Sequence, residues 1–439
     1  MFDAYIVLIG GSVLVALSYV FDLFSKKWKI PSVLFLIGTG MALKVIINYY
    51  EYDLNESFFN LLELLGIIGL IMIVLEAAVD LKIGRDKKKI IKQSIFMALI
   101  ILVVSSLAIA VAIMFFRSEP FFNALVYAIP LSVVSSAVLI PSVHTLTQRK
   151  KEFMIYEATF SDIIGIMFFN FVVMQAGNIF SYEGLLMILA TIVFSFLLSY
   201  SMVYFFSKIK THIKLFLMLA ILALLYSIGK KLNLSSLLII FIFGLVLNNS
   251  KQFFRWKLKN YIDFKAVRTI TKDFRIITAE TAFVVRTFFF VAFGMSINIG
   301  ELMDPNVILV GSIIVVILYV IRYVNFKVFL KTDVLPEIFL APRGLITILL
   351  FFSIPLQYQI HDFSIGILSF VILATSIIMM IALLATPSLK TDDMMIVDYG
   401  LAPAVHNKHD PLEDVEPSGP YCELEHFKTK VKNKYISDS

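Results

Sequence analysis

Residues 153–174 read FMIYEATFSDIIGIMFFNFVVM, a segment long and apolar enough to cross a bilayer that nevertheless carries Glu157 and Asp162 in its first half. A carboxylate inside a membrane span costs at least about 2.5 kcal/mol, so such residues usually line an ion or proton path. At about 100° per residue, Ser161 stacks on Glu157, while Asp162 points about 140° away from Glu157. Two carboxylates that face different directions indicate two separate roles. The alternative interpretation is an interfacial Glu157 and a salt-bridged Asp162 with a packing role.

The composition around this segment is that of an integral membrane protein. Of 439 residues, 59% are hydrophobic and 16% are charged, whereas a soluble chain carries roughly a quarter charged residues. The net charge of +6 does not indicate nucleic-acid binding, because the basic residues cluster in short loops between apolar segments. A single cysteine, Cys422, excludes a disulfide within the chain. The spans contain no pattern of a nucleophile with its base or of a metal cluster, so neither an enzyme nor a cofactor is expected.

Apolar segments recur along the chain and predict an all-α membrane protein of about thirteen transmembrane helices. The segments are 4–24, 30–50, 60–82, 92–116, 120–142, 153–175, 182–206, 214–231, 235–249, 276–298, 306–330, 335–357 and 364–388. Every second loop is basic, which places the N-terminus outside and the C-terminus in the cytoplasm. Residues 250–275 mix aromatic and basic side chains and are expected along the inner membrane surface. The transmembrane domain then covers residues 1–389, and residues 390–439 form a polar cytoplasmic tail.

An internal repeat is visible among these spans. The second and ninth spans align so that Gly40 falls on Gly244, and the third and tenth align so that Ala78 falls near Gly294. Paired spans lie seven apart, an odd number, so the two halves enter the membrane in opposite senses and form an inverted repeat. The fifth span contains Pro130 and Pro141, and the twelfth contains Pro342 and Pro355 at almost the same offset. Because proline removes a backbone hydrogen bond, these two spans are predicted to be broken helices whose ends meet near the midplane.

Other polar side chains in the spans are candidates for an ion path. Ser132, Ser135 and Ser136 surround the break in span five, where their hydroxyls can either join the shell of a cation or make interhelical hydrogen bonds. Glu76 lies deep in span three and is a further candidate for the ion path.

Two arginines inside the spans need counter-charges. Arg286 lies in span ten and Arg343 in span twelve, and Glu157 is a suitable carboxylate for either of them. Arg343, at a predicted break, could instead meet the exposed carbonyls of a helix end, whose dipole favours a cation. The sequence leaves the choice between these partners open.

Together these motifs resemble those of the monovalent cation:proton antiporter superfamily, especially the bacterial sodium/proton exchangers with thirteen spans. EATFSD at 157–162 is similar to the family's E-S-x-x-N-D motif, and APRGLITILL at 341–350 resembles its G-x-R-G span. LEAAVD at 75–80 resembles the F-E-A-G span, and TFFFVAFGMSI at 287–297 resembles the tenth span. The order and spacing of the motifs agree over most of residues 1–388.

Two positions depart from the family pattern. Ser161 stands where many members have Asn or Asp, and VVSSAV at 133–138 stands where the sodium/proton exchangers have T-D-P. The serine pair is closer to the related potassium-efflux branch. Both departures concern the residues expected around the cation.

The resemblance implies roles for individual residues. Asp162 would bind the cation or the proton, and Glu76 matches a glutamate near the family's ion site. Glu157 would be the structural partner of a buried arginine, either Arg286 or Arg343. The remaining candidates for the cation site are hydroxyls, those of Ser161, Ser135 and Ser136. The resemblance also implies a homodimer in the cell (inner) membrane, in contact with lipid.

A secondary active transporter is therefore the expected function. Burial disfavours the charged form of Asp162 and a bound cation favours it, so this carboxylate holds either a proton or a cation. If the site can change the side of the membrane to which it is open only when Asp162 holds a cation or a proton, the two ions cross in opposite directions. Because serine does not titrate and arginine stays protonated, one cation is expected to exchange for one proton without net charge. Sodium is favoured as the cation, with potassium or lithium as alternatives.

Three other functions compete with this prediction. The first is a potassium/proton antiporter of the efflux type. The second is a sodium-coupled symporter of an organic acid on a similar fold, which the scarcity of Asn and Gln in the spans disfavours. The third is a membrane sensor that signals through its tail, which the short tail without a recognisable output domain disfavours.

Overall fold

The computed structural model describes residues 4–49, 68–69, 71–79, 81, 83, 87–174, 182–208, 214–231, 236–254, 263–329, 335–360 and 363–386. Within these ranges, every regular element is a helix. Eight of the helices described there are long and apolar enough to cross a membrane, and α8 and α10 contain shorter apolar stretches. The protein is therefore an all-α membrane protein.

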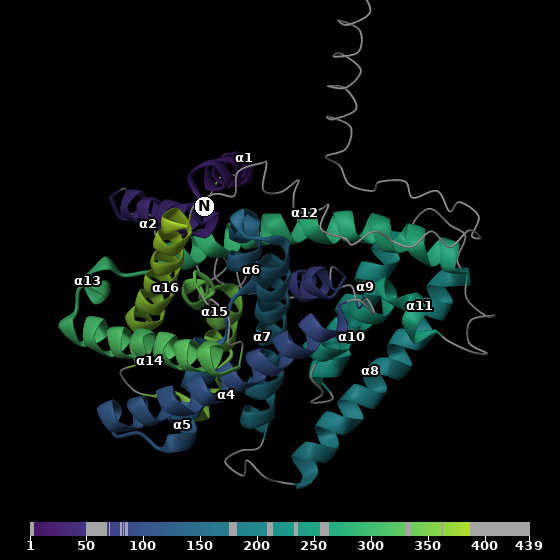
Figure 1. Ribbon diagram of the computed structural model, residues 1–439. Coiled ribbons are helices and arrows are strands. Elements are labelled where there is room, and N and C mark those ends of the chain that lie inside the picture. The colour runs from purple at the N-terminus through teal and green to yellow at the C-terminus, as the bar shows by residue number, and fades with distance from the viewer. Residues whose placement is uncertain are drawn as a thin grey trace, which may run out of the picture. The chain divides into compact units, whose positions relative to one another are not determined.

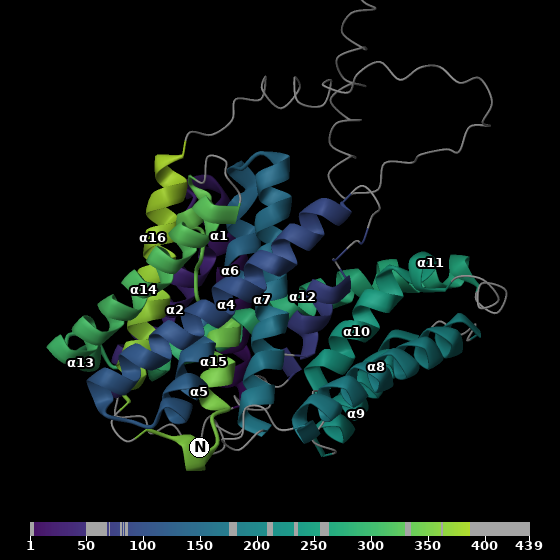
Figure 2. The same cartoon turned by 60° about the horizontal axis from the view of Figure 1, so that its bottom comes forward.

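The first of two groups of helices, the core bundle, surrounds α7, which runs through its middle (Figures 1 and 2). Its members are α4 (Lys88–Arg117), α5 (Phe121–Ser132), α6 (Ser136–Leu139), α7 (Gln148–Met174), α14 (Pro305–Phe329), α15 (Leu345–Phe352) and α16 (Ile365–Ala385). Helices α4, α5, α6 and α15 contact α7, and α14 packs against both α4 and α16.

The second group, the frame bundle, is centred on the pair of α2 and α12 and on α10. Its members are α1 (Ala4–Trp28), α2 (Ser32–Tyr49), helical residues 71–79, α8 (Tyr182–Lys208), α9 (Lys214–Lys231), α10 (Ser236–Asn248) and α12 (Phe264–Ser296). Helices α8 and α9 both pack on α10, and α1 packs on α2. The contacts between the two bundles include those of α7 with α8 and α10 and that of α12 with α15. The short α11 (Ser250–Phe253) follows α10, and α13 (Ile299–Leu302) follows α12.

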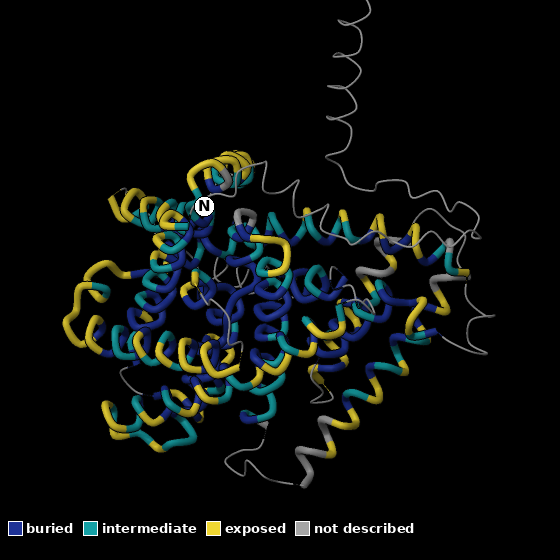
Figure 3. The backbone as a smooth tube through the Cα atoms, in the orientation of Figure 1, coloured by how far each residue is buried: buried dark blue, intermediate teal, exposed yellow. Residues whose placement is uncertain are grey.

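Burial follows the arrangement expected of helices in lipid. Buried residues concentrate around α5, α6, α7 and α15, whereas α1, α8 and α14 carry long exposed stretches (Figure 3). The exposed side chains on these outer helices are largely apolar, as Leu23, Leu197 and Val316 illustrate. Lipid tails cover such surfaces at no cost, so they need no protein partner.

Two predicted spans are broken, as their prolines indicated. Span five is divided into α5, an extended stretch at 133–135, α6 and the 3-10 helix η1 (Ile140–Thr145). Span twelve is divided into the 3-10 helix η3 (Glu337–Phe339), a non-helical stretch at 340–344 and α15. The total of thirteen spans stays a prediction, because span three lies only partly within the described residues.

The long connection before span ten is helical in its second half. Residues 264–275 form the first three turns of α12, and residues 255–262 lie outside the described residues. At 1.5 Å per residue, the 33-residue helix is about 50 Å long, more than the roughly 30 Å of hydrocarbon. The helix is thus longer than the hydrocarbon is thick, and the expected place of residues 264–275 along the inner membrane surface stays a prediction.

The inverted repeat is visible as two equivalent helix crossings in the frame bundle. Helix α2 crosses α12 at Gly40 and Gly294, where a Cβ on Gly40 would lie only 2.8 Å from the Cα of Gly294. In the other half, a Cβ on Gly244 of α10 would lie 2.7 Å from the Cβ of Ala78. These are the four positions that the sequence aligned in pairs, Gly40 with Gly244 and Ala78 with Gly294. Each contact thus joins one member of each aligned pair.

Candidate functional site

The first break leaves an extended stretch, and three backbone N–H groups at the break bond to residues outside this span. Pro130 lies three residues from the end of α5, and residues 133–135 are extended before α6 begins at Ser136. The N–H of Val134 donates to Ser161 Oγ of α7 at 3.0 Å. The N–H of Ser136 donates to Asp162 Oδ2 at 3.0 Å. Two neighbouring residues of α7 therefore hold the break in place.

The second break crosses directly over the first. The N–H of Ser135 donates to the carbonyl of Pro342 at 2.8 Å, so the two breaks share a backbone hydrogen bond. Gly344 is required at this crossing, because a Cβ there would lie 2.7 Å from both Ser135 Oγ and a methyl of Val138. Spans five and twelve thus meet at their breaks, as predicted.

Arg343 places a fixed positive charge at the crossing. Its side chain is 2% exposed, and its guanidinium donates to the carbonyls of Leu131 at 3.0 Å, Ser132 at 3.3 Å and Ala341. Leu131 and Ser132 are the last residues of α5, whose carbonyls lose their helical partners at the break. Arg343 therefore compensates the negative end of the α5 dipole, the second of the two roles that its position suggested.

A hydroxyl on α16 supports Arg343 in turn. The N–H of Arg343 donates to Thr375 Oγ1 at 3.1 Å, and the Thr375 hydroxyl donates to the carbonyl of Val371 at 2.8 Å. This contact is the counterpart of the one between Ser161 and Val134. In both halves, a hydroxyl on the next long helix after the broken span accepts a hydrogen bond from the backbone of the break.

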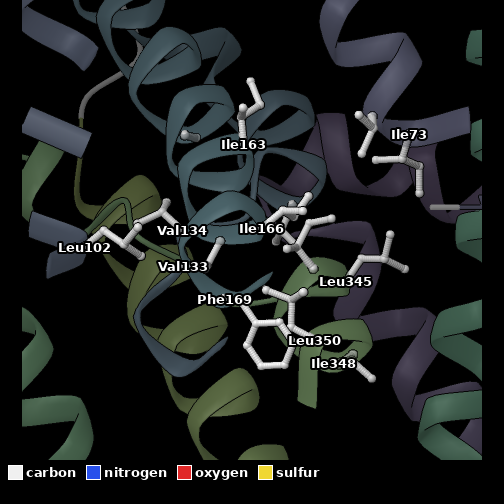
Figure 4. Packing of buried hydrophobic residues seen from close by; sticks show 14 of the residues in the cluster. Ile73, Leu102, Val133, Val134, Ile163, Ile166, Phe169, Leu345, Ile348 and Leu350 are labelled. Atoms are coloured by element: carbon white, nitrogen blue, oxygen red, sulfur yellow. The ribbon is translucent and has the colours of Figure 1, made fainter. Parts of the chain in front are cut away.

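Asp162 keeps unused hydrogen-bonding capacity next to the crossing. Its residue is 6% exposed, and within the described residues Oδ1 has no hydrogen-bond partner. Ser135 Oγ is likewise buried without a partner among those residues. Two buried oxygens without donors are what a dehydrated monovalent cation or a proton would require. Figure 4 shows buried apolar side chains of α4, the first break, α7 and α15 that belong to one packed cluster.

Glu157 forms an ion pair with a different arginine from the two that the sequence suggested. Its carboxylate receives two hydrogen bonds from Arg322 of α14, Nη1–Oε1 at 2.6 Å and Nη2–Oε2 at 2.8 Å. Both side chains are 1% exposed. Arg322 also donates to the carbonyls of Glu337 and Leu340, so the pair ties α7 and α14 to the start of the second break. The expected pairing of Glu157 with Arg286 or Arg343 was wrong.

Arg322 could have been found by the same signal as the other two arginines. It lies in the middle of the apolar segment 306–330, where any arginine needs a partner. The sequence cannot choose among three intramembrane arginines, because Glu157 and Arg322 are 165 positions apart. Glu337, whose carboxylate pairs with Lys150 at 2.8 Å beside the second break, was also not anticipated.

Glu76 pairs with the remaining candidate arginine. Arg286 Nη2 lies 3.3 Å from Glu76 Oε1, and each side chain is 19% exposed. The structure therefore brings Asp162, Ser161, Ser135, Ser136 and Arg343 together at the crossing. It places Glu157 in the pair with Arg322 and Glu76 in the pair with Arg286.

Comparisons with known proteins agree with the fold and give the family. The family described as "Sodium/hydrogen exchanger, transmembrane" matches residues 12–388. One similar solved structure is that of the sodium proton antiporter MjNhaP1 from Methanocaldococcus jannaschii at pH 8, with 19% identity, a TM-score of 0.67, and coverage of 87% of this chain and 99% of that one. An electron-microscopy structure of the same antiporter gives 18% identity, a TM-score of 0.65, and coverage of 92% and 100%. None of the curated proteins matches this chain.

Proposed function

Because the chain belongs to the sodium/hydrogen exchanger family, we propose that it exchanges one monovalent cation for one proton across the membrane, with Asp162 binding each in turn. The observation that carries this proposal is the position of Asp162. It is buried at the crossing of two broken helices, with Oδ2 bound to the Ser136 N–H and Oδ1 free of partners among the described residues.

The exchange follows from competition for one carboxylate. A buried carboxylate without a counter-charge is strongly unfavourable, so Asp162 is stable when it carries a proton or when a cation neutralises it. A cation also needs other oxygens, and the hydroxyls of Ser135, Ser136 and Ser161 border the same break. The Ser161 hydroxyl already accepts one backbone hydrogen bond and keeps a second lone pair.

Alternating access would move the crossing relative to its surroundings. The core bundle holds both breaks, Asp162 and the ion pair of Glu157 with Arg322, so we assign it the role of the moving part. The frame bundle, in which α2 and α12 cross closely, is then the stationary part. It also carries the surface that contacts a second copy of the chain. We propose a homodimer in the cell (inner) membrane, with the N-terminus outside and the C-terminal residues 390–439 in the cytoplasm.

We favour sodium as the cation, because the similar structures are those of a sodium proton antiporter. Potassium is the second candidate, because Ser135 and Ser136 offer neutral oxygens at the break. A carboxylate at either position would instead attract sodium, the smaller ion, more strongly. Lithium is the third cation to test.

The proposal is tested with the full-length protein in proteoliposomes. An internal acid load quenches a pH-sensitive dye, and sodium, potassium or lithium is then added outside in separate runs. Recovery of fluorescence with sodium, dependent on the protein, is the expected result. Recovery with potassium alone would assign the protein to potassium exchange. No recovery with any of the three cations, from a protein shown to be folded, would contradict the proposed function.

A further inference from the structure

The two broken spans are held by equivalent backbone contacts. In the first half, Ser161 of α7 accepts the N–H of Val134. The next residue of α7, Asp162, accepts the N–H of Ser136, which is the first residue of α6. The start of α6, where the positive end of its helix dipole lies, is therefore matched by a carboxylate.

The second half repeats this arrangement without the carboxylate. Thr375 of α16 accepts the N–H of Arg343 at 3.1 Å. Arg343 lies two residues before the start of α15, as Val134 lies two residues before the start of α6. The next residue of α16 is Ser376, which thus stands where the first half has Asp162. Because α15 and α16 contain no Asp or Glu, the start of α15 lacks the negative charge that α6 receives.

Three fully buried hydroxyls near the start of α15 have no hydrogen-bond partner among the described residues. They belong to Ser376 of α16, Thr347 in the first turn of α15 and Ser135 in the first break. Ser135 Oγ would lie 2.7 Å from a Cβ on Gly344, the residue directly before α15. Side chains of a helix lean toward its N-terminus, so Thr347 covers the same end. Other buried helical hydroxyls donate to the carbonyl four residues earlier, as Ser106 does.

The charge at this end of α15 is positive. Arg343 is buried and donates to three backbone carbonyls, none of which carries a full negative charge. Of the two buried carboxylates of α7, Glu157 is bound by Arg322, and Asp162 is needed for the transported ions. The first N–H groups of α15 have no acceptors within the helix, and Gly344 makes no side-chain cap hydrogen bond. A buried cation, a helix N-terminus and unused hydroxyls together suit an anion.

We propose that a small monovalent anion such as chloride binds at the N-terminus of α15, where the hydroxyls of Ser376 and Thr347 donate to it and Arg343 balances its charge. The anion takes the place that the Asp162 carboxylate has in the first half. The close packing around Gly344 favours a monatomic ion over sulfate or phosphate.

The anion acts on exchange without being transported. Its negative charge near the crossing attracts the cation that Asp162 binds, so exchange needs less sodium when the anion is present. This effect on exchange rests on the proposed function, whereas the binding of the anion does not.

The first experiment measures binding without transport, by the melting temperature of the purified full-length protein in detergent. The salts are N-methyl-D-glucamine chloride, bromide and gluconate at equal ionic strength, so that no transported metal cation is present. Chloride and bromide should raise the melting temperature in a saturable way relative to gluconate, because a ligand of the folded state stabilises it. Equal melting in the three salts would mean that water satisfies these hydroxyls, and it would overturn the inference.

Substitutions then locate the anion. Thr347→Val and Ser376→Ala each remove one donor and should raise the chloride concentration for half-maximal stabilisation about tenfold or more. Ser369→Ala is the matched control, because it removes another buried, unpartnered hydroxyl of α16 two turns away and should leave this concentration unchanged. Ser376→Asp supplies the carboxylate covalently and should remove the response to chloride from a folded protein. The wild-type chloride response in both Thr347→Val and Ser376→Ala would place the anion elsewhere and overturn the inference.

The second experiment measures exchange in proteoliposomes that contain chloride or gluconate on both sides. The sodium concentration for half-maximal exchange should be lower in chloride by about threefold or more, and Ser376→Asp should show one value in both salts. The same sodium requirement in both salts, for a wild type that binds chloride, would overturn the effect on exchange. Absence of sodium-driven proton flux would instead contradict the proposed function, and the melting experiment would still decide whether the anion binds.

Discussion

Asp162 uses one carboxylate oxygen to hold the backbone of the first break and keeps the other available for a ligand. We predict that Asp162→Asn abolishes exchange without unfolding the protein, because an amide accepts the Ser136 N–H equally well but cannot bind the competing proton. Asp162→Glu should retain partial activity with a shifted pH dependence. Dye dequenching in proteoliposomes measures exchange, and a thermal melting curve in detergent measures folding.

The control for this substitution is Asp273→Asn, the same change at an exposed position of α12. It should leave both exchange and melting near wild-type values. Substantial exchange by purified Asp162→Asn would rule out Asp162 as the proton carrier.

The ion pair of Glu157 with Arg322 makes a prediction about stability. Glu157→Gln leaves a buried guanidinium unpaired, and breaking such a pair costs about 3–5 kcal/mol. We expect a large drop in melting temperature, and we expect the double variant Glu157→Gln/Arg322→Met to be less destabilised than the sum of the two single variants. Melting temperatures of the single and double variants measure this coupling.

The corresponding cycle with Arg343 is the control, because Arg343 bonds to the carbonyls of Leu131, Ser132 and Ala341. Its effect should be closer to additive with that of Glu157→Gln. Unchanged melting of Glu157→Gln together with lost cation binding would show that Glu157 is a ligand of the ion.

Residue-level prediction from the sequence had a clear limit. The angle of about 140° between Glu157 and Asp162 follows from helix geometry, and the structure gives the two carboxylates different partners. The identity of the arginine was not predictable, because it depends on which distant helices pack together. The Glu76–Arg286 pair was missed for the same reason, since 210 positions separate its two members.

At the scale of elements, Thr375 of α16 tests how the second break is held. Thr375→Val keeps the shape of the side chain but removes the acceptor of the Arg343 N–H, and an unsatisfied buried N–H costs about 1–3 kcal/mol. We expect lower stability and slower exchange, both restored by Thr375→Ser. Melting curves and exchange rates of the two variants check this prediction.

Ser369→Ala is the matched control, because Ser369 is a buried hydroxyl of the same helix with no partner among the described residues. Its effect should be small. If Ser369→Ala lowered the melting temperature and the exchange rate as much as Thr375→Val, loss of any buried hydroxyl on α16 would explain the effect. The hydrogen bond to Arg343 would then not be its cause.

The crossing of α2 and α12 gives a second prediction for elements. In Gly40→Ala, the added Cβ would overlap the carbonyl of Val291 and the backbone at Gly294, which cannot rotate away as a side chain can. Overpacking of this kind costs about 1–3 kcal/mol, so melting temperature should fall. Gly38→Ala is the control, since a Cβ at Gly38 meets no atom within 4 Å. Similar melting of both variants would contradict a tight crossing.

Element-level prediction succeeded where hydrophobicity and proline dominate. The two breaks and the internal repeat could be predicted, because proline interrupts helices and because both halves keep small residues at equivalent crossings. The start of α12 was misplaced by twelve residues, since basic residues at 264–275 indicate a position outside the hydrocarbon but do not end a helix. The charge pattern gave no signal for the backbone conformation of this segment.

At the scale of the whole molecule, a lysine joins the two bundles. Lys29, in the turn between α1 and α2, donates to the carbonyls of Thr386 at 3.0 Å and Leu383 at 3.4 Å. We predict that Lys29→Met increases amide hydrogen exchange in the last turn of α16, because a cation at a helix C-terminus stabilises it by about 0.3–1 kcal/mol, which corresponds to about a two- to fivefold change. Mass spectrometry of peptic fragments that cover residues 376–386 measures the effect.

Lys27→Met is the control, because Lys27 is exposed in the same region. It should leave exchange in this fragment unchanged. No difference between Lys29→Met and the wild type would mean that the lysine does not hold the end of α16.

The lysine contact also constrains the order in which the molecule is built. Lys29 is 354 positions from Leu383 and 357 from Thr386. The lysine lies between the first two helices of the described chain, and its acceptors lie at the end of the last one. A ribosome delivers the spans to the membrane one after another from the N-terminus. Until nearly every other span has been synthesised, the acceptor carbonyls are therefore missing, and the Lys29 ammonium is solvated by water or lipid head groups. The hydrogen bonds from Lys29 to the end of α16 therefore form in one of the last steps of assembly.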